Sequence, residues 1–591
     1  MSRMMKTALL LVTVLGCSSD DELPSENPPP TWGVPISGGN LHVTRDGAAV
    51  VTDPDRDRIL MVDLATQNIL AEVPVPGDEP GRIVEDGAGR VHVALRRGGA
   101  VLTFANGRSP EVLARRAVCA EPRGLAWQAA TDQVHVACAS GELVSLLASG
   151  GAPVRTKRLD RDLRDVVVSN GQLVATKFRS SELMTIDAQG SVVTRTSPPI
   201  VQRFGFRPDG PTTTGAADAV PAVAWRTVTL PNGKLLVSHQ RQVKGQLSME
   251  TGGYGGGCDG SSGPVESALT LIEPGLPPSA LAPIASGALP VDLAASPNGQ
   301  LVAVATAGNN KVSVAPVSVL ASRDKDMCRP PHPDDDDKDD DGLGAPTSVT
   351  FTPGNDLVII YPEAPALVVR GVTSGKASQT IMLPGEIGYD AGRQVFHGQT
   401  AIGLACASCH PEARDDGRVW TFEGVGTRRT QNLAGSILQR GPYHWVGDEK
   451  DLGVLMDDVF ANRMGGGEVT RSQKLSLGPW LDRVPAPAPT PMIDVTAVER
   501  GRTVFVSAGC ETCHGGALLT NNQLFDVGTG GKFKVPSLVG ISARAPFMHT
   551  GCAATLRDRF SGGCGGGDRH GTTSTLTAGQ IDDLVAYLES L

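Results

Sequence analysis

Aromatic residues are scarce in this chain of 591 residues: Phe, Trp and Tyr together make up 4% of the sequence. Glycine and proline are plentiful, with 71 and 43 copies. Both residue types disfavour helix interiors and occur often in turns. The composition therefore favours many turns and short strands over long helices. The length exceeds that of one ordinary domain and indicates three or more domains.

The chain also lacks an excess of basic residues and a long apolar segment at its N-terminus. The formal net charge is −10, and this argues against a nucleic-acid partner because nucleic-acid-binding proteins carry a basic surface. Residues 8–15 form an apolar run behind Arg3 and Lys6. The run is too short to cross a bilayer as a helix and has the form of an export signal.

The apolar run ends in Val14-Leu15-Gly16-Cys17, which resembles a bacterial lipobox. The resemblance implies that residues 1–16 are a signal peptide, that the Cys17 thiol is acylated, and that the chain contacts a membrane through this lipid. Ser18 after the cysteine implies the outer membrane, facing the periplasm or the cell surface. Residues 17–35 are expected to be a flexible tether. An ordinary secretory signal with a chance cysteine is the alternative.

Residues 36–384 repeat short β-rich runs separated by turns. Residues 82–84 lead to 91–94, and residues 124–126 lead to 134–137, in closely similar patterns. The early copies recur about every 41 residues, a period that predicts the blades of an all-β propeller. We expect six or seven blades. The pattern resembles the YVTN-type propellers of surface and periplasmic proteins, and a β-sandwich array is the alternative.

Two similar units follow from residue 385. The first, residues 385–484, contains GRQVF at residues 392–396, and the second, residues 492–591, contains GRTVF at residues 501–505. The Pro-rich residues 485–491 are expected to link them. We therefore predict a duplicated small domain that is mainly helical.

Each unit contains one Cys-x-x-Cys-His motif. The motifs comprise Cys406, Cys409 and His410, and Cys510, Cys513 and His514. This spacing is the attachment signal of c-type haem. Two thiols one helical turn apart add to the haem vinyl groups, and the adjacent histidine becomes the proximal iron ligand. The sequence thus predicts two covalently bound haems. A zinc site would have its cysteine pairs closer in sequence, and a thioredoxin-like site would have one motif in a βαβ context.

The distal ligand of each iron is open at this stage. The candidates are Met464 and His444 in the first unit, and Met548, His549 and His570 in the second. Met464 and Met548 are the expected ligands because methionine is a soft axial ligand that raises the haem potential. Each methionine could instead fill an apolar core, and His549 could bind a haem propionate.

Residues 385–591 resemble the bacterial di-haem cytochrome c peroxidase and MauG family. The resemblance rests on both haem motifs and on APFMHTG at residues 545–551, which follows KVPSL at residues 534–538. It implies two cytochrome c-like domains and an oxidoreductase that moves electrons between its haems and peroxide or a partner protein. It also implies that Trp420 lies between the haems as an electron relay, with haem packing as the alternative role.

Three positions depart from that family. Gly563 stands where the peroxidases have the methionine of the second haem, and Phe560 is the nearest aromatic residue to the MauG tyrosine. Arg463 replaces an acidic residue that helps the peroxidases to cleave peroxide. A pure electron carrier with six-coordinate irons, and a surface-binding protein acting through its propeller, therefore stand as alternatives. His239 is a candidate for the junction of the propeller with the haem units, or a surface residue at a strand end.

Six further cysteines are Cys119, Cys138, Cys258, Cys328, Cys552 and Cys564. An even number in an exported protein suggests three disulfides. Proximity favours the pairs 119–138, 258–328 and 552–564, but sequence does not fix the connectivity.

An acidic insertion occupies residues 334–341. Asp337, Asp339, Asp341 and Gly342 have the spacing of the start of a calcium-binding loop. The glutamate that closes such a loop is missing from the sequence. A solvated acidic loop is therefore favoured over a Ca²⁺ site.

Overall fold

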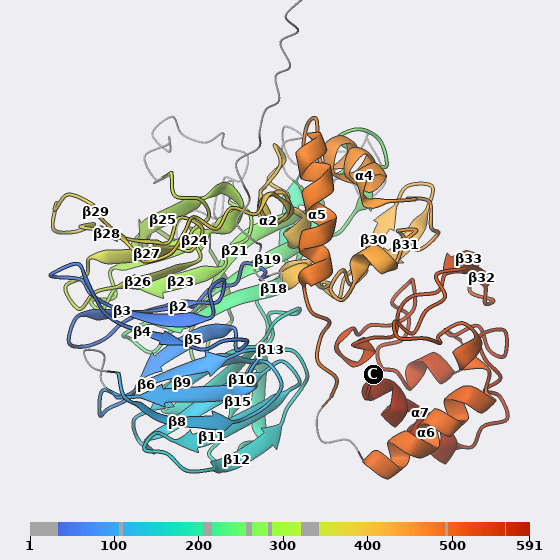
Figure 1. Cartoon of the computed structure of the whole chain (residues 1–591), viewed down its shortest axis with the longest axis horizontal. Helices are drawn as coiled ribbons and strands as arrows, with labels where there is room; N and C mark the ends of the chain where they lie inside the picture. The colour runs from blue at the N-terminus through green and yellow to red at the C-terminus, as the bar shows by residue number, and fades with distance from the viewer. Residues whose placement is uncertain are drawn as a thin grey trace, which may run out of the picture.

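The structure is a computed structural model, which describes residues 34–105, 110–204, 216–255, 263–281, 287–320, 342–490, 494–561 and 563–591. Among these described residues, seven sheets of three to five strands lie between Leu41 and Met382. The mainly helical part of the chain lies beside them (Figure 1). The lipobox cysteine Cys17, the Cys258–Cys328 pair and the acidic insertion fall outside the described residues.

The first four sheets are antiparallel and have four strands each. Their strands are β1 (Leu41–Val43), β2 (Ala48–Asp53), β3 (Arg58–Asp63) and β4 (Asn68–Pro74); β5 (Pro80–Glu85), β6 (Val91–Leu95), β7 (Ala100–Phe104) and β8 (Val112–Ala117); β9 (Pro122–Gln128), β10 (Gln133–Cys138), β11 (Glu142–Leu147) and β12 (Pro153–Arg158); and β13 (Leu163–Ser169), β14 (Gln172–Lys177), β15 (Leu183–Ile186) and β16 (Val192–Thr196).

The other three sheets vary in size. Their strands are β17 (Val201–Phe204), β18 (Ala216–Thr229), β19 (Leu235–Val243), β21 (Val265–Ile272) and β22 (Ser279–Ala280); β23 (Asp292–Ala295), β24 (Leu301–Thr306) and β25 (Lys311–Pro316); and β26 (Ser348–Phe351), β27 (Leu357–Tyr361), β28 (Ala366–Arg370) and β29 (Gln379–Met382). Two short helices, η1 (Ala307–Asn309) and α1 (Val317–Leu320), flank β25.

The seven sheets are arranged as the blades of a closed ring. Contacts between blades run through β1, β5, β9, β13, β18, β23 and β26 in turn, and β26 also contacts β1. Apolar side chains fill the space between neighbouring blades; Leu41 and Val51 of the first blade pack with Ile360 and Leu367 of the last. A single blade could not bury both of its faces, so the ring supplies the core. The predicted propeller is confirmed, and the described residues form seven blades, the larger of the two expected numbers.

Two helical units follow the ring. The first contains α2 (Ala391–His397), α3 (Cys406–Cys409), η3 (Pro411–Ala413), β30 (Val419–Phe422), β31 (Gly426–Arg429), η4 (Ile437–Gln439), α4 (Leu452–Leu455), the π-helical η5 (Met456–Arg463) and α5 (Arg471–Arg483). The second contains α6 (Val495–Ser507), η6 (Cys510–Thr512), β32 (Leu524–Asp526), β33 (Lys532–Lys534), η7 (Ile541–Ala543), η8 (Asp558–Phe560) and α7 (Ala578–Glu589). In the described part of the chain, every helix is too short or too polar to span a membrane.

Both units use the same helix crossing. In the first, α2 packs against α5, and in the second, α6 packs against α7. A Cβ atom on Gly392 would lie 2.4 Å from the Ser476 carbonyl oxygen, and one on Gly501 would lie 1.9 Å from that of Asp583. Only glycine allows such close approach. The repeated GRxVF sequence therefore corresponds to a repeated packing arrangement.

The first helical unit is joined to the ring by backbone pairing and by apolar packing. The short strand β20 (Gln246–Leu247), which follows β19, pairs in parallel with β30 of the first unit. Trp225 and Tyr361 of the ring belong to the same buried cluster as Phe396 and Trp480 of the helices. The ring and the first unit thus share a hydrophobic core.

Candidate haem sites

The two Cys-x-x-Cys-His motifs have closely similar backbone geometry. Cys406–Cys409 form the single turn α3, and the His410 N–H donates to the Cys406 carbonyl at 2.9 Å. In the second motif the His514 N–H donates to the Cys510 carbonyl, also at 2.9 Å. All four motif cysteines are unpaired thiols. Each motif therefore offers two thiols and an imidazole from one tight turn, as attachment of haem c requires.

The two motif histidines present the same ring nitrogen for coordination. His410 Nδ1 lies 3.2 Å from the Arg414 carbonyl oxygen, and His514 Nδ1 lies 3.2 Å from that of Leu519. A carbonyl only accepts, so Nδ1 carries the proton and Nε2 keeps its lone pair. Burial lowers the pKa of both imidazoles, that of His514 to about 4. A neutral imidazole held by a backbone carbonyl is the usual state of a histidine that binds a metal.

A cavity of about 260 Å³ surrounds the second motif. Cys510, Cys513 and His514 line one part of it. The walls are mostly apolar, and five cationic side chains also line the cavity: Arg429, Lys534, Arg544, Arg559 and Arg569. An apolar slot suits the porphyrin, and the cations suit its two propionates. The residues present therefore fit a haem group.

The first motif is enclosed by an apolar cluster instead. Met464 and Trp420 belong to it and pack with Cys406 and Cys409. Leu247, from the propeller, is part of the same cluster. Burial raises the pKa of the Cys406 thiol to about 12 and that of Cys409 well above its usual value. Through Leu247, the propeller contributes directly to the surroundings of this motif.

Polar and ionisable groups lie beside this cluster. Tyr254 packs against the cluster, and its backbone N–H donates to the Arg463 carbonyl at 3.1 Å. Arg463 forms an ion pair with Asp458. Burial and the neighbouring Asp458 raise the pKa of Glu449 to about 7. A carboxyl group with this pKa can give or take a proton near neutral pH.

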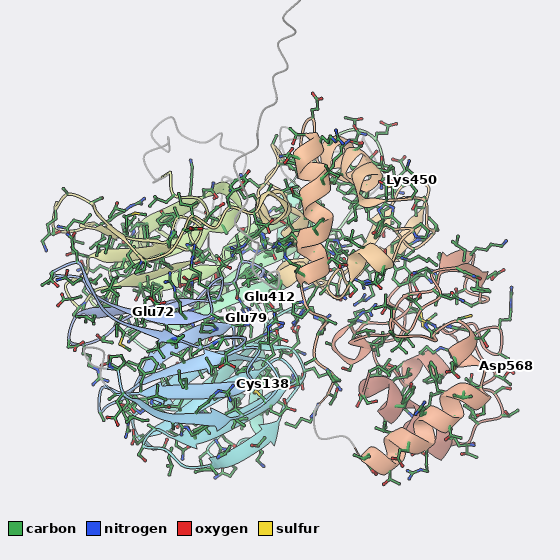
Figure 2. All side chains as sticks on the ribbon, viewed as in Figure 1. Glu72, Glu79, Cys138, Glu412, Lys450 and Asp568 are labelled. Carbon is green, nitrogen blue, oxygen red and sulfur yellow. A yellow bond between two sulfur atoms is a disulfide. The ribbon has the colours of Figure 1, made fainter. Side chains whose placement is uncertain are left out.

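Glu412, two residues after the first motif, anchors that motif to the propeller. Its carboxylate lies 2.7 Å from Arg164, 3.1 Å from Arg96 and 3.2 Å from Arg123. Burial alone would raise the pKa of Glu412, but the arginines outweigh burial and hold it well below its usual value. Figure 2 shows Glu412 close to Glu79 where the ring meets the helical unit. We call Glu412 and its three arginines the Glu412 cluster.

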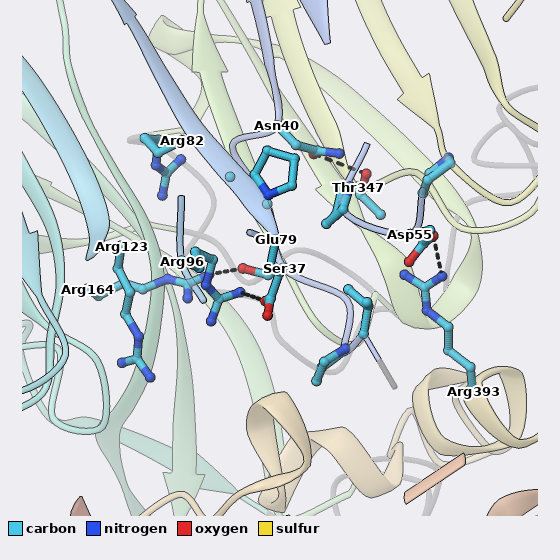
Figure 3. Close-up of a pocket in the computed structure, with 17 residues that line it drawn as sticks. Ser37, Asn40, Asp55, Glu79, Arg82, Arg96, Arg123, Arg164, Thr347 and Arg393 are labelled. Atoms are coloured by element: carbon cyan, nitrogen blue, oxygen red, sulfur yellow. Dashed lines mark hydrogen bonds and ion pairs between the residues drawn. The ribbon is translucent and has the colours of Figure 1, made fainter. Parts of the chain in front are cut away.

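A small cavity of about 30 Å³ lies next to the Glu412 cluster. Figure 3 shows the arginines Arg96, Arg123 and Arg164 on one side of it, and the ion pair between Arg393 of α2 and Asp55 on the other. The Arg393–Asp55 distance is 2.7 Å. A volume of this size suits one or two water molecules. The charges here serve to hold the first helical unit on the ring.

The structure separates the two tryptophans near the haem motifs. Trp420 stays with the first motif, where its Nε1–H donates to Thr430 Oγ1 at 3.0 Å. Trp445, which sequence reasoning missed, lines the cavity of the second motif and donates to the Arg429 carbonyl at 2.8 Å. Its position next to His444, in a stretch that parallels residues 546–549, was the available signal. Trp445 thus lies where the first unit reaches the second haem site.

Other candidate residues are placed as follows. Met548, His549 and His570 line the second cavity, and His549 stacks on Phe533 with ring centres 3.8 Å apart. His444 is bonded to Asp448 at 3.0 Å.

His239 is fully buried in β19 and bonded to Thr270, so the interpretation as a surface residue is wrong. Its neighbour Gln240 donates to the Ser408 carbonyl at 3.3 Å and so reaches the first motif.

Two of the predicted disulfides are present among the described residues. Cys119 pairs with Cys138 in the propeller, and Cys552 pairs with Cys564 in the second helical unit. Proximity in sequence was therefore a correct guide to these two pairs.

One comparison assigns a domain. Residues 498–591 match the family model described as cytochrome c. The chain contains a cytochrome c domain. The motif within the matched range is the one at Cys510, Cys513 and His514. At least one covalently bound haem c follows, and the cytochrome assignment of residues 385–484 remains a prediction.

Hydrazine synthase subunit gamma of Kuenenia stuttgartiensis is 29% identical over 145 residues, which are 24% of this chain and 35% of that protein. The match thus spans about a third of the relative's length. A solved structure of Kuenenia stuttgartiensis hydrazine synthase covers 62% of this chain and 99% of that chain, at 16% identity and a TM-score of 0.41. A streptogramin B lyase structure covers 56% and 93%, at 11% identity and a TM-score of 0.36.

Proposed function

We propose that this chain is a di-haem c-type cytochrome that acts as an oxidoreductase and carries one haem in each helical unit. The observation that supports this most is the shared geometry of the two motifs, in which both histidines donate Nδ1–H to a backbone carbonyl and keep Nε2 free. Because one motif lies in a cytochrome c domain, the same arrangement in the other unit supports the same cofactor.

Bound haem would supply one-electron redox chemistry and, at an open iron position, a site for peroxide. Backbone carbonyls of the chain would orient the proximal imidazoles, and its side chains would exclude water from the haem and move protons. We propose that peroxide or a partner protein exchanges electrons at the first site, where Glu449 has a pKa of about 7 and Arg463 supplies a positive charge. Trp445 is better placed than Trp420 to relay electrons, because it lines the second cavity.

The haem count tests this proposal. The full chain, produced in a host that attaches haem c, is expected to contain two haems by its pyridine haemochrome spectrum. Cys406→Ala with Cys409→Ala, and Cys510→Ala with Cys513→Ala, are each expected to leave one haem. A wild-type protein with a single haem, unchanged by the first pair of substitutions, would contradict the di-haem assignment.

A non-catalytic electron carrier is the second candidate. Met464 packs with Cys406 and Cys409, and as a distal ligand it would close the first iron to peroxide. Adding peroxide to the half-reduced protein separates the two functions. An enzyme oxidises its haems and consumes peroxide repeatedly, whereas a carrier with closed irons keeps its spectrum.

We further propose that the chain is lipid-anchored in the cell envelope through Cys17, with the propeller as a scaffold for the first haem unit. The disulfides Cys119–Cys138 and Cys552–Cys564 suit an oxidising compartment. Cys17→Ala is expected to release the protein from the membrane fraction of a bacterial host. Membrane association that survives this substitution would contradict the lipid anchor.

A further inference from the structure

His570 lies close to the proximal histidine of the second haem site. The centres of the His514 and His570 rings are 6.3 Å apart, and the ring planes are inclined by 34°. Both rings line the cavity that holds the second motif. We infer that His570 is the distal ligand of the haem bound at His514, so that this iron is held between two imidazoles. The inference rests on the proposed haem and names its sixth ligand.

The spacing of the two rings matches an iron held between them. With metal–nitrogen bonds of about 2 Å, and roughly 1 Å more from each nitrogen to its ring centre, two imidazoles on one metal have centres about 6 Å apart. The observed separation is 6.3 Å. Each ring can rotate about its own metal–nitrogen bond, so an inclination of 34° is compatible with coordination.

His570 also presents the correct nitrogen. Its Nδ1 lies 3.2 Å from the Gly565 carbonyl oxygen. The carbonyl accepts, so Nδ1 carries the proton and Nε2 keeps its lone pair. His514 and His410 make the same type of bond through the same nitrogen. A backbone carbonyl behind the ring fixes the orientation and the tautomer of a metal-binding histidine.

The segment that carries His570 is fixed next to the haem motif. The Thr572 N–H donates to the Ala508 carbonyl at 2.9 Å, two residues before Cys510. The Asp568 carboxylate accepts from the backbone N–H groups of Thr573 and Ser574, each at 2.9 Å. The Cys552–Cys564 disulfide closes the chain just before this segment. The ligand is therefore held in place before haem binds.

The competing residues have other contacts. His549 lies flat on Phe533, with ring centres 3.8 Å apart, and its backbone carbonyl accepts from Arg429. Met548 packs against the apolar cluster that contains Phe505 and Leu584. The expected ligand Met548 is therefore replaced by His570 in our proposal. With histidine on both sides of the second haem, that haem has no open position and serves to relay electrons. Exogenous ligands would then bind at the first haem.

Spin state tests the inference in the full-length protein with both haems attached. His570→Ala is expected to convert one of the two ferric haems from low spin to high spin in electron paramagnetic resonance and optical spectra. Added imidazole is expected to restore the low-spin signal, because the cavity left by the side chain admits the free ligand. His570→Met is expected to keep the haem low-spin and to raise its potential. Met548→Ala and His549→Ala are the matched controls and should leave the spin state unchanged.

The failures of the two proposals are distinguishable. If the haem content shows no haem at Cys510 and Cys513, the proposed function fails. If two haems are present and Met548→Ala, not His570→Ala, changes the spin state, only the ligand assignment is wrong. Where His570→Ala does not accumulate, near-infrared magnetic circular dichroism of the wild type decides, since a histidine–methionine signature for the second haem would overturn the inference.

Discussion

Glu412 is the residue at which the first haem motif meets the propeller. Three arginines from different parts of the ring share its carboxylate, and one of them, Arg96, is 316 residues away in sequence. A buried carboxylate costs free energy unless cations compensate it, and buried cations cost free energy in the same way. The cluster is therefore stable only when the ring and the haem unit are together.

Glu412→Gln is expected to destabilise the protein by about 3 kcal/mol, because it leaves buried arginines without their counter-charge. Thermal unfolding of the haem-loaded protein would measure the loss. The exposed Glu468 offers a matched control, and Glu468→Gln should leave the unfolding temperature within error of the wild type. Equal unfolding temperatures for the two variants would contradict the anchoring role.

Asp416 gives the first unit a defined pH dependence. Burial raises its pKa to about 6, above the value of about 4 for the unfolded chain. Between these values the folded state binds more protons, so the contribution of Asp416 to stability falls as pH rises from about 4 to about 6. Asp416→Asn removes this dependence and still accepts the Arg418 N–H, which bonds to Asp416 at 2.8 Å.

Urea unfolding at two pH values measures the effect. The free energy of unfolding of Asp416→Asn, relative to that of the wild type, is expected to be higher at pH 7 than at pH 4 by on the order of 2 kcal/mol. A difference between variant and wild type that does not change with pH would show that Asp416 titrates normally.

At the scale of elements, the crossing of α6 and α7 depends on the absence of a side chain at Gly501. A Cβ atom there would lie 1.9 Å from the Asp583 carbonyl oxygen and 2.8 Å from Tyr587 Cβ. The two helices must separate to admit it, and such overpacking costs about 1–3 kcal/mol. The helix propensity gained by replacing glycine with alanine, about 1 kcal/mol, offsets only part of this cost.

Gly501→Ala is therefore expected to lower the unfolding temperature of the second haem unit, followed through the Soret absorbance. Gly579, in the first turn of α7, has no atom within 4 Å of an added Cβ. Gly579→Ala should keep or raise the unfolding temperature. The packing argument fails if both alanine variants behave alike.

At the scale of the whole molecule, Arg179 of the propeller connects all three parts of the chain. Its guanidinium donates to Asp415 of the first unit at 2.9 Å and to the Ala545 carbonyl of the second unit at 3.0 Å. It also pairs with Asp162 within the ring, at 2.9 Å. The second haem unit is thus held against the ring as well as by its linker.

Arg179→Ala is expected to reduce the free energy that holds the second unit against the ring by about 1.5–3 kcal/mol, the usual range for hydrogen bonds to a charged group. Limited proteolysis within residues 485–491 should then become faster. The control is Arg195→Ala, because Arg195 pairs with Asp160 on the exposed edge of its blade. Unchanged cleavage in Arg179→Ala would mean that the linker and the other contacts suffice.

Local and periodic signals were enough to predict much of this molecule. The haem motifs are contiguous because two thiols and an imidazole must reach one porphyrin, so the sequence determined Cys510, Cys513 and His514 as a site. The propeller followed from its period, since each blade repeats the same strand pattern. Two disulfides followed from proximity, because short loops bring their cysteines together.

The partners of these motifs were decided only by the tertiary structure. His570 lies close to His514, Trp445 lines the second cavity, and Glu412 meets three arginines. Each pair comes from segments whose separation in sequence carries no periodic signal. Closure of the ring and the helix crossings set these distances, and the same composition would allow Met548 as readily as His570. Neighbouring positions in the chain specify where haem is attached, whereas tertiary packing decides which side chain lies near the proximal histidine.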